Sequence, residues 1–461
     1  MIQFFNTLTQ KKEEFIPIEK DVVKMYTCGP TVYDLAHIGN FRAYVFEDLL
    51  HRYLEFVGYK VKRVMNITDI DDKTIKGAKS QGISLKEYTT KYIKAFIEDI
   101  EILNLRKPDY LPLATEHIPE MVSLIKKLIE KGYAYKKNGS IYFRISKFKE
   151  YGKLSHIDLS GIQPGARIDI DEYTKEDVKD FVLWKEAKEN EVFWETEIGK
   201  GRPGWHIECS AMSMKYLGET FDIHTGGVDN IFPHHENEIA QSEAATGKQF
   251  VRYWLHCAHL LVNNEKMSKS KGNFYTLRDL LKKGYNPKGI RYLLLTTHYR
   301  DPLNFTEKAL ISAENTIKNY NDFYWKLNFY NGEKYNKELS EKIKIAKQNF
   351  ISYLGDDLNI SPAIGSIFNF IKEANIVLNE GNFNKENICE IKNFLEEIDN
   401  VLQILEKKEE KLPDEIQKLI EEREKARKEK NFKKSDEIRK ILEEKGIILE
   451  DTPSGTRWKR R

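Results

Sequence analysis

The chain has 461 residues and a net charge of +2, with 32% charged and 40% hydrophobic residues. This length exceeds one ordinary hydrophobic core, so we expect two to four domains. The near-neutral charge gives no general indication of nucleic-acid binding, although a local positive surface can still bind a phosphate backbone.

The four cysteines are widely separated, which argues against a disulfide framework and for a reducing compartment. The first fifteen residues contain no basic segment followed by an apolar run, so we expect no secretory signal. No uninterrupted apolar stretch reaches the length that a membrane helix needs. We therefore expect a cytoplasmic protein without membrane association, and its size favours an enzyme over a scaffold.

Residues 22–68 form the first organised region. Residues 22–26 predict a buried strand, and residues 28–40 a loop marked by glycine and proline. Residues 40–57 predict a helix that stops at Gly58, because apolar residues recur there at helical spacing. A second strand is predicted within residues 59–68. This order is typical of a parallel βαβ unit.

Residues 116–197 differ in character. Residues 116–132 predict an amphipathic helix that ends at a glycine, and residues 139–155 are strand-rich. The stretch that follows, up to about residue 197, is acidic and irregular. Because ordered sequence returns from Gly201 onward, this region indicates an insertion between the two halves of a nucleotide-binding sheet.

The segment 226–247 reads GGVDNIFPHHENEIAQSEAATG and predicts a helix that begins after Pro233. His234 and Glu238 are four residues apart and share one helix face, so their side chains can converge on one ion. Together with Cys28 and Cys209 they offer sulfur, imidazole and carboxylate ligands, which zinc accepts. Taken alone, a buried cysteine is usually a packing residue and a His/Glu pair at this spacing is usually a surface contact, so spacing alone does not establish the site.

These candidate ligands are spread over both halves of the predicted sheet, so they could meet only after the large domain folds. That arrangement indicates a site for substrate or chemistry and not a structural zinc knuckle, in which closely paired cysteines nucleate a small fold.

Two segments have the chemistry of phosphate binding. His37, Gly39 and Asn40 lie where a loop turns into a helix, whose free N–H groups and positive dipole end suit a triphosphate. Lys266 and Lys269 belong to KMSKS, followed by Lys271-Gly272, and predict a cationic clamp on the phosphates. A solvated Lys/Ser loop is the alternative reading of KMSKS.

Beyond residue 300 the pattern changes to long helices, then to a charged helical pair and a strand-turn-strand with a basic tail. The predicted fold class is α/β: a Rossmann-like parallel-sheet domain split by an insertion, then an α-helical bundle and a small C-terminal α+β domain. The predicted borders are 1–115 and 198–305 for the two halves of the sheet domain, 116–197 for the insertion, 306–407 for the bundle and 408–461 for the last domain.

The chain resembles the cysteinyl-tRNA synthetases of class I over nearly its whole length, from about Tyr26 to Trp458. The signatures that carry the resemblance stand in the family's order: TCGPTVYDLAHIGNFR, NITDIDDK, GRPGWHIECSAMS, DIHTGGVDNIFPHHENEIAQSEA, EKMSKSKGNF and GIILEDTPSGTRW.

The resemblance implies a metal site that selects the amino acid. Cys28, Cys209, His234 and Glu238 match the family's zinc positions, where the metal binds the thiolate of the substrate cysteine. Zinc binds a thiolate strongly, whereas a hydrophobic pocket separates near-isosteres by only about 1–3 kcal/mol. Thr68 and Trp205 match segments that line the cysteine pocket. His224 is close enough in sequence to take part, but a packed histidine or one that supports a ligand is an equal alternative.

The resemblance also implies an ATP site. His37 and Asn40 match the family's HIGH motif, with Gly39 between them, although Asn40 replaces the second histidine and puts the detail of that contact in doubt. Lys266 and Lys269 match the KMSKS lysines. Gly227 and Asp229 match a GGxD segment that meets the ribose; Lys269 also contacts ATP.

The implied reaction joins L-cysteine to tRNA(Cys) through a cysteinyl-adenylate, with ATP as substrate and Mg²⁺ assisting. The helical region and the last domain would reach the anticodon, where residues 457–461 offer charge and stacking; Trp458 is equally consistent with a core position. We expect a monomer with one zinc ion.

Two alternatives remain open. A cysteine ligase that acts on an amino-sugar would share the zinc and ATP sites but lack a full anticodon-binding region. A non-catalytic RNA-binding protein descended from a synthetase would have lost catalytic side chains, and only Asn40 favours that reading.

Overall fold

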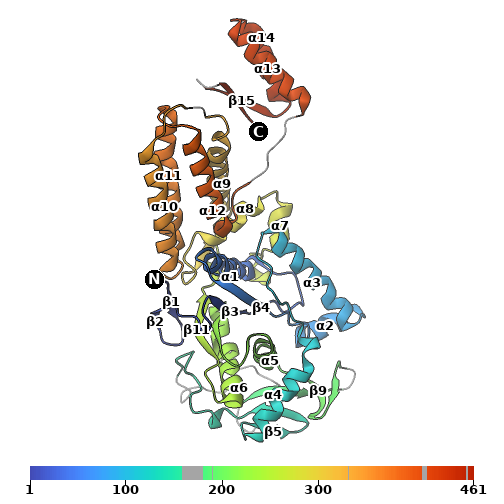
Figure 1. Cartoon of the computed structure of the whole chain (residues 1–461). Helices are drawn as coiled ribbons and strands as arrows, with labels where there is room; N and C mark the ends of the chain where they lie inside the picture. Colours follow the sequence, from blue (N-terminus) through green and yellow to red (C-terminus); the bar gives the residue numbers. More distant parts are fainter. Residues whose placement is uncertain (158–179, 189–190, 331, 407–412, 453–454, 461) are drawn as a thin grey trace. The chain divides into compact units, whose positions relative to one another are not determined.

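The computed structural model describes residues 1–157, 180–188, 191–330, 332–406, 413–452 and 455–460. The chain divides into two compact units (Figure 1). The first comprises Met1–Ile311 and Ile351–Ala363, and the second comprises Ser312–Phe350 and Ile364–Arg461. All the residues predicted for catalysis, ATP, cysteine and metal belong to the first unit.

A parallel sheet forms the centre of the first unit. Its order is β11–β10–β3–β4, formed by β3 (Val22–Thr27), β4 (Lys60–Met65), β10 (Phe221–Gly227) and β11 (Val251–Cys257). The strands are mostly apolar and almost completely buried, as expected for a parallel sheet covered on both faces. This sheet confirms the predicted Rossmann-like α/β fold.

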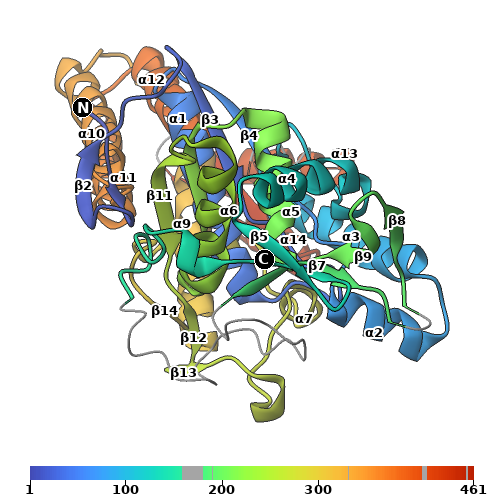
Figure 2. The same cartoon turned by 90° about the horizontal axis from the view of Figure 1, so that it is seen from below.

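Helices cover both faces of this sheet. α1 (Ile38–Phe56) connects β3 to β4, and α6 (Glu236–Thr246) connects β10 to β11. The two connections leave the sheet centre in opposite directions, so right-handed crossovers place α1 and α6 on opposite faces (Figures 1 and 2). α5 (Trp205–Leu217) packs against α6. The direction of the strand order reverses between β3 and β10. Open α/β sheets bind ligands at such a topological switch point.

The insertion contains α4 (Ile118–Glu130) and a five-stranded antiparallel sheet of order β5–β6–β7–β9–β8. Its strands are β5 (Ala134–Lys137), β6 (Ser140–Phe143), β7 (Phe181–Glu186), β8 (Trp194–Thr196) and β9 (Gly199–Pro203). The predicted strand-rich stretch 139–155 is only partly right, because β6 ends at Phe143 and turns follow. Most of the acidic stretch lies outside the described residues.

The turns after β6 are held by a buried carboxylate at the start of α6. Glu236 accepts hydrogen bonds from the backbone N–H groups of Gly152, Leu154 and Ser155, at 2.8, 3.1 and 2.8 Å. Three backbone donors converge on one carboxylate, which compensates for its burial. The chain therefore prefers turns to a strand here for a tertiary reason that local pattern does not contain.

The remaining elements of the first unit complete the sheet domain. They are β1 (Gln3–Asn6), β2 (Lys11–Glu14), α2 (Asp72–Gln81), α3 (Leu85–Ile102), β12 (Leu260–Val262), β13 (Glu265–Lys266), α7 (Leu277–Lys282), α8 (Pro287–Leu295) and β14 (Leu303–Phe305). β1 and β2 form a hairpin, and β13, β12 and β14 form a small sheet.

The second unit is largely helical, as predicted. The long helices are α9 (Glu307–Lys326), α10 (Lys337–Gly355), α11 (Ile360–Asn379) and α12 (Lys385–Leu402). Edge-to-face contacts of Tyr320 with Phe368 and of Phe370 with Phe394 join α11 to its neighbours.

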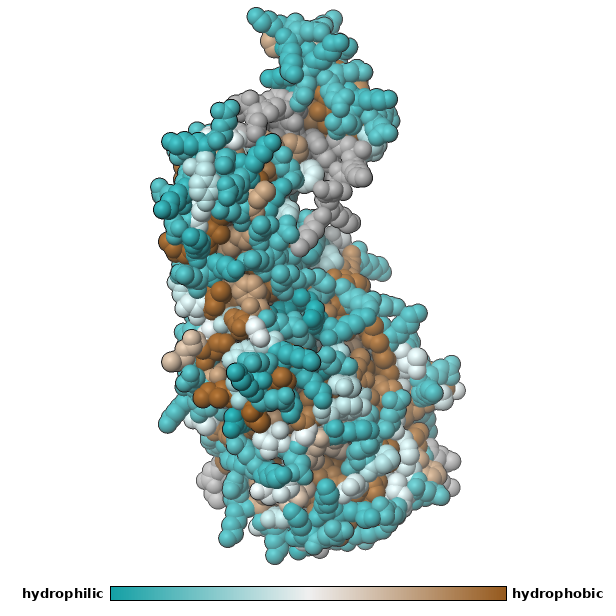
Figure 3. Space-filling view, in the orientation of Figure 1, coloured by the Kyte–Doolittle hydropathy of each residue, from teal (hydrophilic) through white to brown (hydrophobic). Residues whose placement is uncertain are grey.

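A small α+β domain ends the chain, with α13 (Asp414–Lys428), α14 (Phe432–Glu444), β15 (Ile447–Thr452) and β16 (Gly455–Arg460). Its core contains Ile416, Ile420, Ile438, Leu442, Ile447 and Leu449. The outer surface of the helix pair is mainly hydrophilic (top of Figure 3), which fits its charged sequence. The side chains of residues 450–461 are outside the described part, so the roles predicted for residues 457–461 stay predictions.

Among the described residues, no helix combines the length and apolar character that crossing a membrane requires.

Acid should destabilise the first unit through His51 on α1. Burial and the positive charge of Arg63 lower its pKa to about 4, although Glu55 and Asp48 oppose the shift. Since the folded pKa lies below the unfolded value, the unfolded chain binds the proton more readily. The contribution of His51 to the free energy of unfolding is fully present above about pH 6.5 and is lost as the pH falls toward 4. By pH 5 the loss is about 1–2 kcal/mol.

The measurement is thermal unfolding at pH 7 and pH 5, in wild type and in His51→Gln. Glutamine cannot take up the proton, so the drop in Tm between the two pH values should be smaller in the variant. An equal drop in both proteins would contradict this role of His51.

Candidate active site

A cavity of about 500 Å³ opens at the carboxyl ends of the parallel strands. Segments that follow β3, β4, β10 and β11 line it, together with the start of α1. This is the place that the sheet topology favours for a ligand. Every predicted site residue except Glu238 contributes to its lining; Glu238 is buried behind it.

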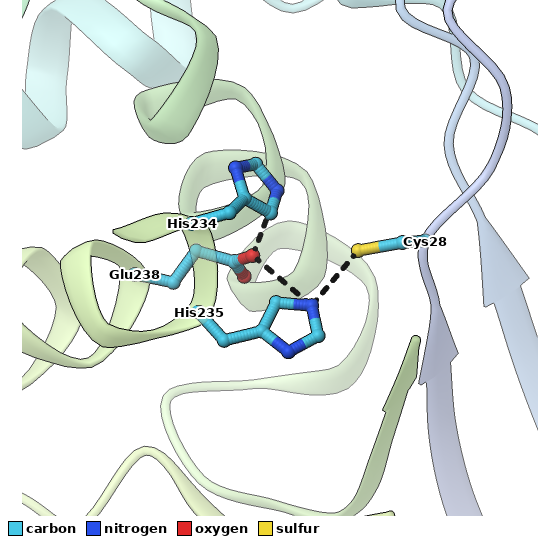
Figure 4. Close-up of side chains that lie close together, drawn as sticks. All are labelled: Cys28, His234, His235 and Glu238. Atoms are coloured by element: carbon cyan, nitrogen blue, oxygen red, sulfur yellow. Dashed lines mark hydrogen bonds and ion pairs between the residues drawn. The ribbon is translucent and has the colours of Figure 1, made fainter. Parts of the chain in front are cut away.

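At one end, four side chains bring their ligand atoms within 4.8 Å of one another: Cys28, His234, His235 and Glu238 (Figure 4). Cys28 follows β3, the two histidines lie in a turn over Ile231–His235, and Glu238 is in the first turn of α6. His234 Nε2 is 3.0 Å from Glu238 Oε1, and His235 Nε2 is 3.2 Å from Cys28 Sγ. The helix starts at Glu236, two residues later than predicted, yet the side chains of His234 and Glu238 still converge.

Cys209 is buried on α5 beside this cluster but is not one of its four members. It interacts with both Cys28 and His234: the hydrogen bond from Cys28 is the main effect that lowers the pKa of Cys209 to about 6, with His234 contributing and burial opposing. The structure thus brings three of the four predicted ligands into one group and places the fourth next to it. His235, which sequence reasoning did not select, is the additional member.

The cluster has the electrostatics of a cation site. Burial alone would raise the pKa of Glu238, but the charges of His224 and His234, together with the hydrogen bond from His224, lower it to about 2. His224 Nε2 lies 3.0 Å from Oε2. The other oxygen, Oε1, is within ion-pair distance of His234 but has no hydrogen bond among the described residues. A buried carboxylate oxygen with this unused capacity, beside sulfur and imidazole, fits zinc.

A chain of hydrogen bonds orients His235. Its Nδ1 lies 2.8 Å from Nε2 of His256, and Nδ1 of His256 lies 2.7 Å from Oγ1 of Thr7. Both ring nitrogens of His235 are therefore engaged, one with His256 and one with Cys28. Burial and the neighbouring histidines lower the pKa of His235 well below its usual value, so the ring is neutral and holds Cys28 in place.

The other end of the cavity suits phosphate. His37 caps the N-terminus of α1: its Nδ1 accepts from the backbone N–H of Asn40 at 3.2 Å, and the backbone N–H of His37 donates to Asn40 Oδ1 at 3.1 Å. Burial lowers the pKa of His37, so the neutral ring carries its proton on Nε2. The amide NH₂ of Asn40 is likewise left as a donor, because its oxygen is already bonded.

Gly39 is required by a close approach within this cap. A Cβ at Gly39 would lie 2.9 Å from Nδ1 of His37 and 3.2 Å from Cε of Met267. Gly39→Ala should therefore displace His37 and raise the KM for ATP by about 10- to 100-fold, the usual effect of a small misplacement in a phosphate site. Gly365→Ala, which meets nothing within 4 Å, is the control with the same change. Equal ATP kinetics in the two variants would contradict this requirement.

The KMSKS loop borders the same end. Lys266 ends β13 and is exposed, while Lys269 opens a short 3₁₀ turn over Lys269–Lys271. Lys269 forms an ion pair with Asp34 and lies 5.0 Å from the ring centre of Phe274. Gly227 and Asp229 line the cavity as well. A Cβ at Gly227 would lie 2.3 Å from Asp229 Oδ1, so this conformation of the Asp229 side chain requires glycine at position 227.

Trp205 and Thr68 also line the cavity. Trp205 begins α5 and stacks on the ring of His234, with centroids 4.0 Å apart. Thr68 follows β4 and is buried, with its hydroxyl 2.8 Å from Glu208 Oε2. The cavity therefore joins a metal-type cluster, an aromatic wall and a phosphate-type end.

Comparisons of fold agree with this architecture. The methionyl-tRNA synthetase of Mycobacterium tuberculosis bound by methionyl-adenylate matches with a TM-score of 0.64 and 13% identity, over 83% of this chain and 92% of that one. The LeuRS of Agrobacterium radiobacter K84, in a ternary complex with tRNA and LeuAMS, matches with a TM-score of 0.61 and 10% identity, over 85% of each chain. The fold is that of the class I aminoacyl-tRNA synthetases.

Comparisons of sequence are more specific. Residues 14–315 match the model of the class I (C) tRNA synthetase catalytic domain, residues 349–406 the DALR domain, and residues 409–458 the cysteinyl-tRNA ligase anticodon binding domain. The cysteine–tRNA ligase of Brachyspira hyodysenteriae is 51% identical over 100% of this chain and 99% of its own length. That of Solibacter usitatus is 50% identical over the full length of both. The chain belongs to the cysteine–tRNA ligase family, as its motifs predicted.

Proposed function

We propose that this protein is a cysteine–tRNA ligase that joins L-cysteine to tRNA(Cys) through a cysteinyl-adenylate and selects cysteine with a zinc ion. The observation that carries the proposal is one cavity with a Cys/His/Glu cluster at one end and a capped helix N-terminus facing two lysines at the other. A thiol amino acid fits the first end and the phosphates of a nucleoside triphosphate fit the second. Adenylation needs both substrates side by side in one cavity.

Cys28, Cys209, His234 and Glu238 would hold the zinc ion, with His235 supporting Cys28. Bound there, zinc favours the thiolate of cysteine over the hydroxyl of serine. Trp205, stacked on His234, would close the pocket around the short side chain and exclude water. No editing site is then required, because the choice between cysteine and serine is made by the kind of donor atom and not by size.

In the first step the carboxylate of cysteine attacks the α-phosphorus of ATP, and pyrophosphate leaves. His37 and Asn40 would donate hydrogen bonds to the phosphates, and Lys266 and Lys269 would balance the charge that develops on the leaving group. Asp229 would accept from the ribose. Mg²⁺ enters this step together with ATP.

In the second step a hydroxyl of the terminal ribose of tRNA attacks the adenylate carbonyl, and AMP leaves. The protein would mainly supply proximity and orientation. The match of residues 409–458 to an anticodon-binding domain supports a role of the second unit in choosing tRNA(Cys). We expect the monomer to be active and to work in the cytoplasm.

The test is cysteine-dependent ATP–pyrophosphate exchange, with serine as competitor and zinc assayed on the same sample. We expect exchange with cysteine, none with serine, and about one zinc ion per chain. Added tRNA(Cys) should then become charged; exchange without charging would instead favour a ligase for another acceptor. A folded, zinc-loaded protein that gives no exchange would exclude adenylation and favour a non-catalytic RNA-binding protein.

A further inference from the structure

Three buried polar side chains form a chain behind the centre of the cavity. Asn66 and Thr68 follow β4, and Glu208 lies in the first turn of α5. They are 2%, 1% and 0% exposed, respectively, and Asn66 and Thr68 line the cavity. Because buried polar groups are costly unless they are bonded, the direction of each hydrogen bond here is under strong constraint.

The amide of Asn66 has one possible orientation. The backbone N–H of Gly29 donates to Asn66 Oδ1 at 2.9 Å, and a backbone N–H can only donate. The oxygen therefore faces Gly29 and the NH₂ group faces Thr68, whose Oγ1 lies 3.2 Å from Nδ2. Asn66 must donate to Thr68, so the usual ambiguity between amide oxygen and nitrogen does not arise.

The proton of the Thr68 hydroxyl then points away from Asn66 and toward Glu208. It accepts from Asn66 and donates its single proton to Oε2 of Glu208 at 2.8 Å. One lone pair of Oγ1 remains, and only a hydrogen-bond donor can use it.

We propose that Glu208 is a positioning residue, which accepts the hydrogen bond of the Thr68 hydroxyl and thereby makes Thr68 an acceptor for the ammonium group of the substrate amino acid. The inference rests on the proposed function and deepens it. The Cys/His/Glu cluster would bind the thiol of the substrate, and the hydrogen-bonded residues Asn66, Thr68 and Glu208 would recognise its ammonium group. A thiol without this group fits the metal end but leaves the lone pair of Thr68 unpaired.

The test compares the binding of cysteine with that of two analogues, each lacking one charged group, in wild-type protein and in variants of Thr68 and Glu208. The ligands are L-cysteine, cysteamine, which lacks the carboxylate, and 3-mercaptopropionate, which lacks the ammonium group. Their affinities are measured by calorimetry on zinc-loaded protein, with zinc assayed in each sample. Thr68→Val should weaken cysteine and cysteamine about tenfold or more, the usual effect of losing a charged hydrogen bond, and leave 3-mercaptopropionate within about twofold.

Glu208→Gln should weaken the same two ligands, because its amide can donate to Thr68 and turn the hydroxyl proton toward the cavity. Thr68→Ser keeps the hydroxyl and should restore the preference for ligands with an ammonium group. Ser213→Ala, on the same helix with a hydroxyl that donates to the backbone of Ser210, is the control and should change none of the affinities.

In Thr68→Val, a loss of affinity for cysteine and 3-mercaptopropionate with cysteamine unchanged would show that Thr68 donates to the carboxylate, which overturns the proposal. An equal loss for all three ligands, with or without loss of zinc, would also overturn it and leave these residues a structural role. Wild-type protein that binds zinc but none of the thiols would refute the proposed function itself, and the inference with it.

Discussion

Cys28→Ala is expected to abolish zinc binding and to reduce cysteine-dependent ATP–pyrophosphate exchange about 1,000-fold or more. A metal that binds a substrate directly contributes several kcal/mol, and about 4 kcal/mol corresponds to a factor of roughly 1,000. Cys28 alone reaches the cluster from β3, and its sulfur lies beside His235. The measurements are zinc content by elemental analysis and exchange kinetics. The exposed Cys389 supplies the control, since Cys389→Ala should leave both unchanged.

Zinc content also shows whether Cys209 or His235 is the fourth ligand. Cys209→Ala should lose the zinc, because its thiol interacts with both Cys28 and His234 and its low pKa leaves it as a thiolate. His235→Asn should keep about one zinc ion at lower affinity, since both nitrogens of His235 are already engaged and the loss of such a supporting contact costs about 10- to 100-fold. Zinc retained by Cys209→Ala but lost by His235→Asn would replace Cys209 with His235 in the ligand set.

Lys269→Ala is expected to lower kcat for exchange about 100- to 1,000-fold, the range found when one positioned donor to a developing negative charge is removed. Its affinity for cysteine should stay unchanged, because Lys269 lies at the phosphate end. The ion pair with Asp34 raises the pKa of Lys269, so the ammonium group keeps its charge across the working pH range and can exchange Asp34 for phosphate.

Lys271→Ala is the matched control for this prediction. Lys271 stands two residues away in the same loop and pairs with Glu265 at 2.8 Å, and it should change kcat less than about threefold, as expected for an exposed ion pair. Equal losses in the two variants would mean that the loop contributes general positive charge and that Lys269 has no specific place in the reaction.

Local sequence patterns predicted the helices and strands correctly where the residues of an element themselves determine its structure. Residues 40–57 predicted α1 within two residues at its start, since apolar spacing and the stop at Gly58 are local properties. The helical second unit and the charged pair α13–α14 followed for the same reason. The stretch 139–155 did not, because Glu236, some eighty residues away, supplies the carboxylate that holds its turns.

The sequence by itself determined the kind of chemistry: KMSKS and the HIGH-type loop are recognisable as residue types at short spacing, and the four widely separated candidate ligands through the resemblance to a family. The tertiary structure decided which atoms meet. It placed His235 in the cluster with Cys28, and it gave Thr68 a fixed hydrogen-bond direction through Asn66 and Glu208. Such contacts join the ends of strands far apart in sequence, and they form only when the parallel sheet brings those ends to one edge.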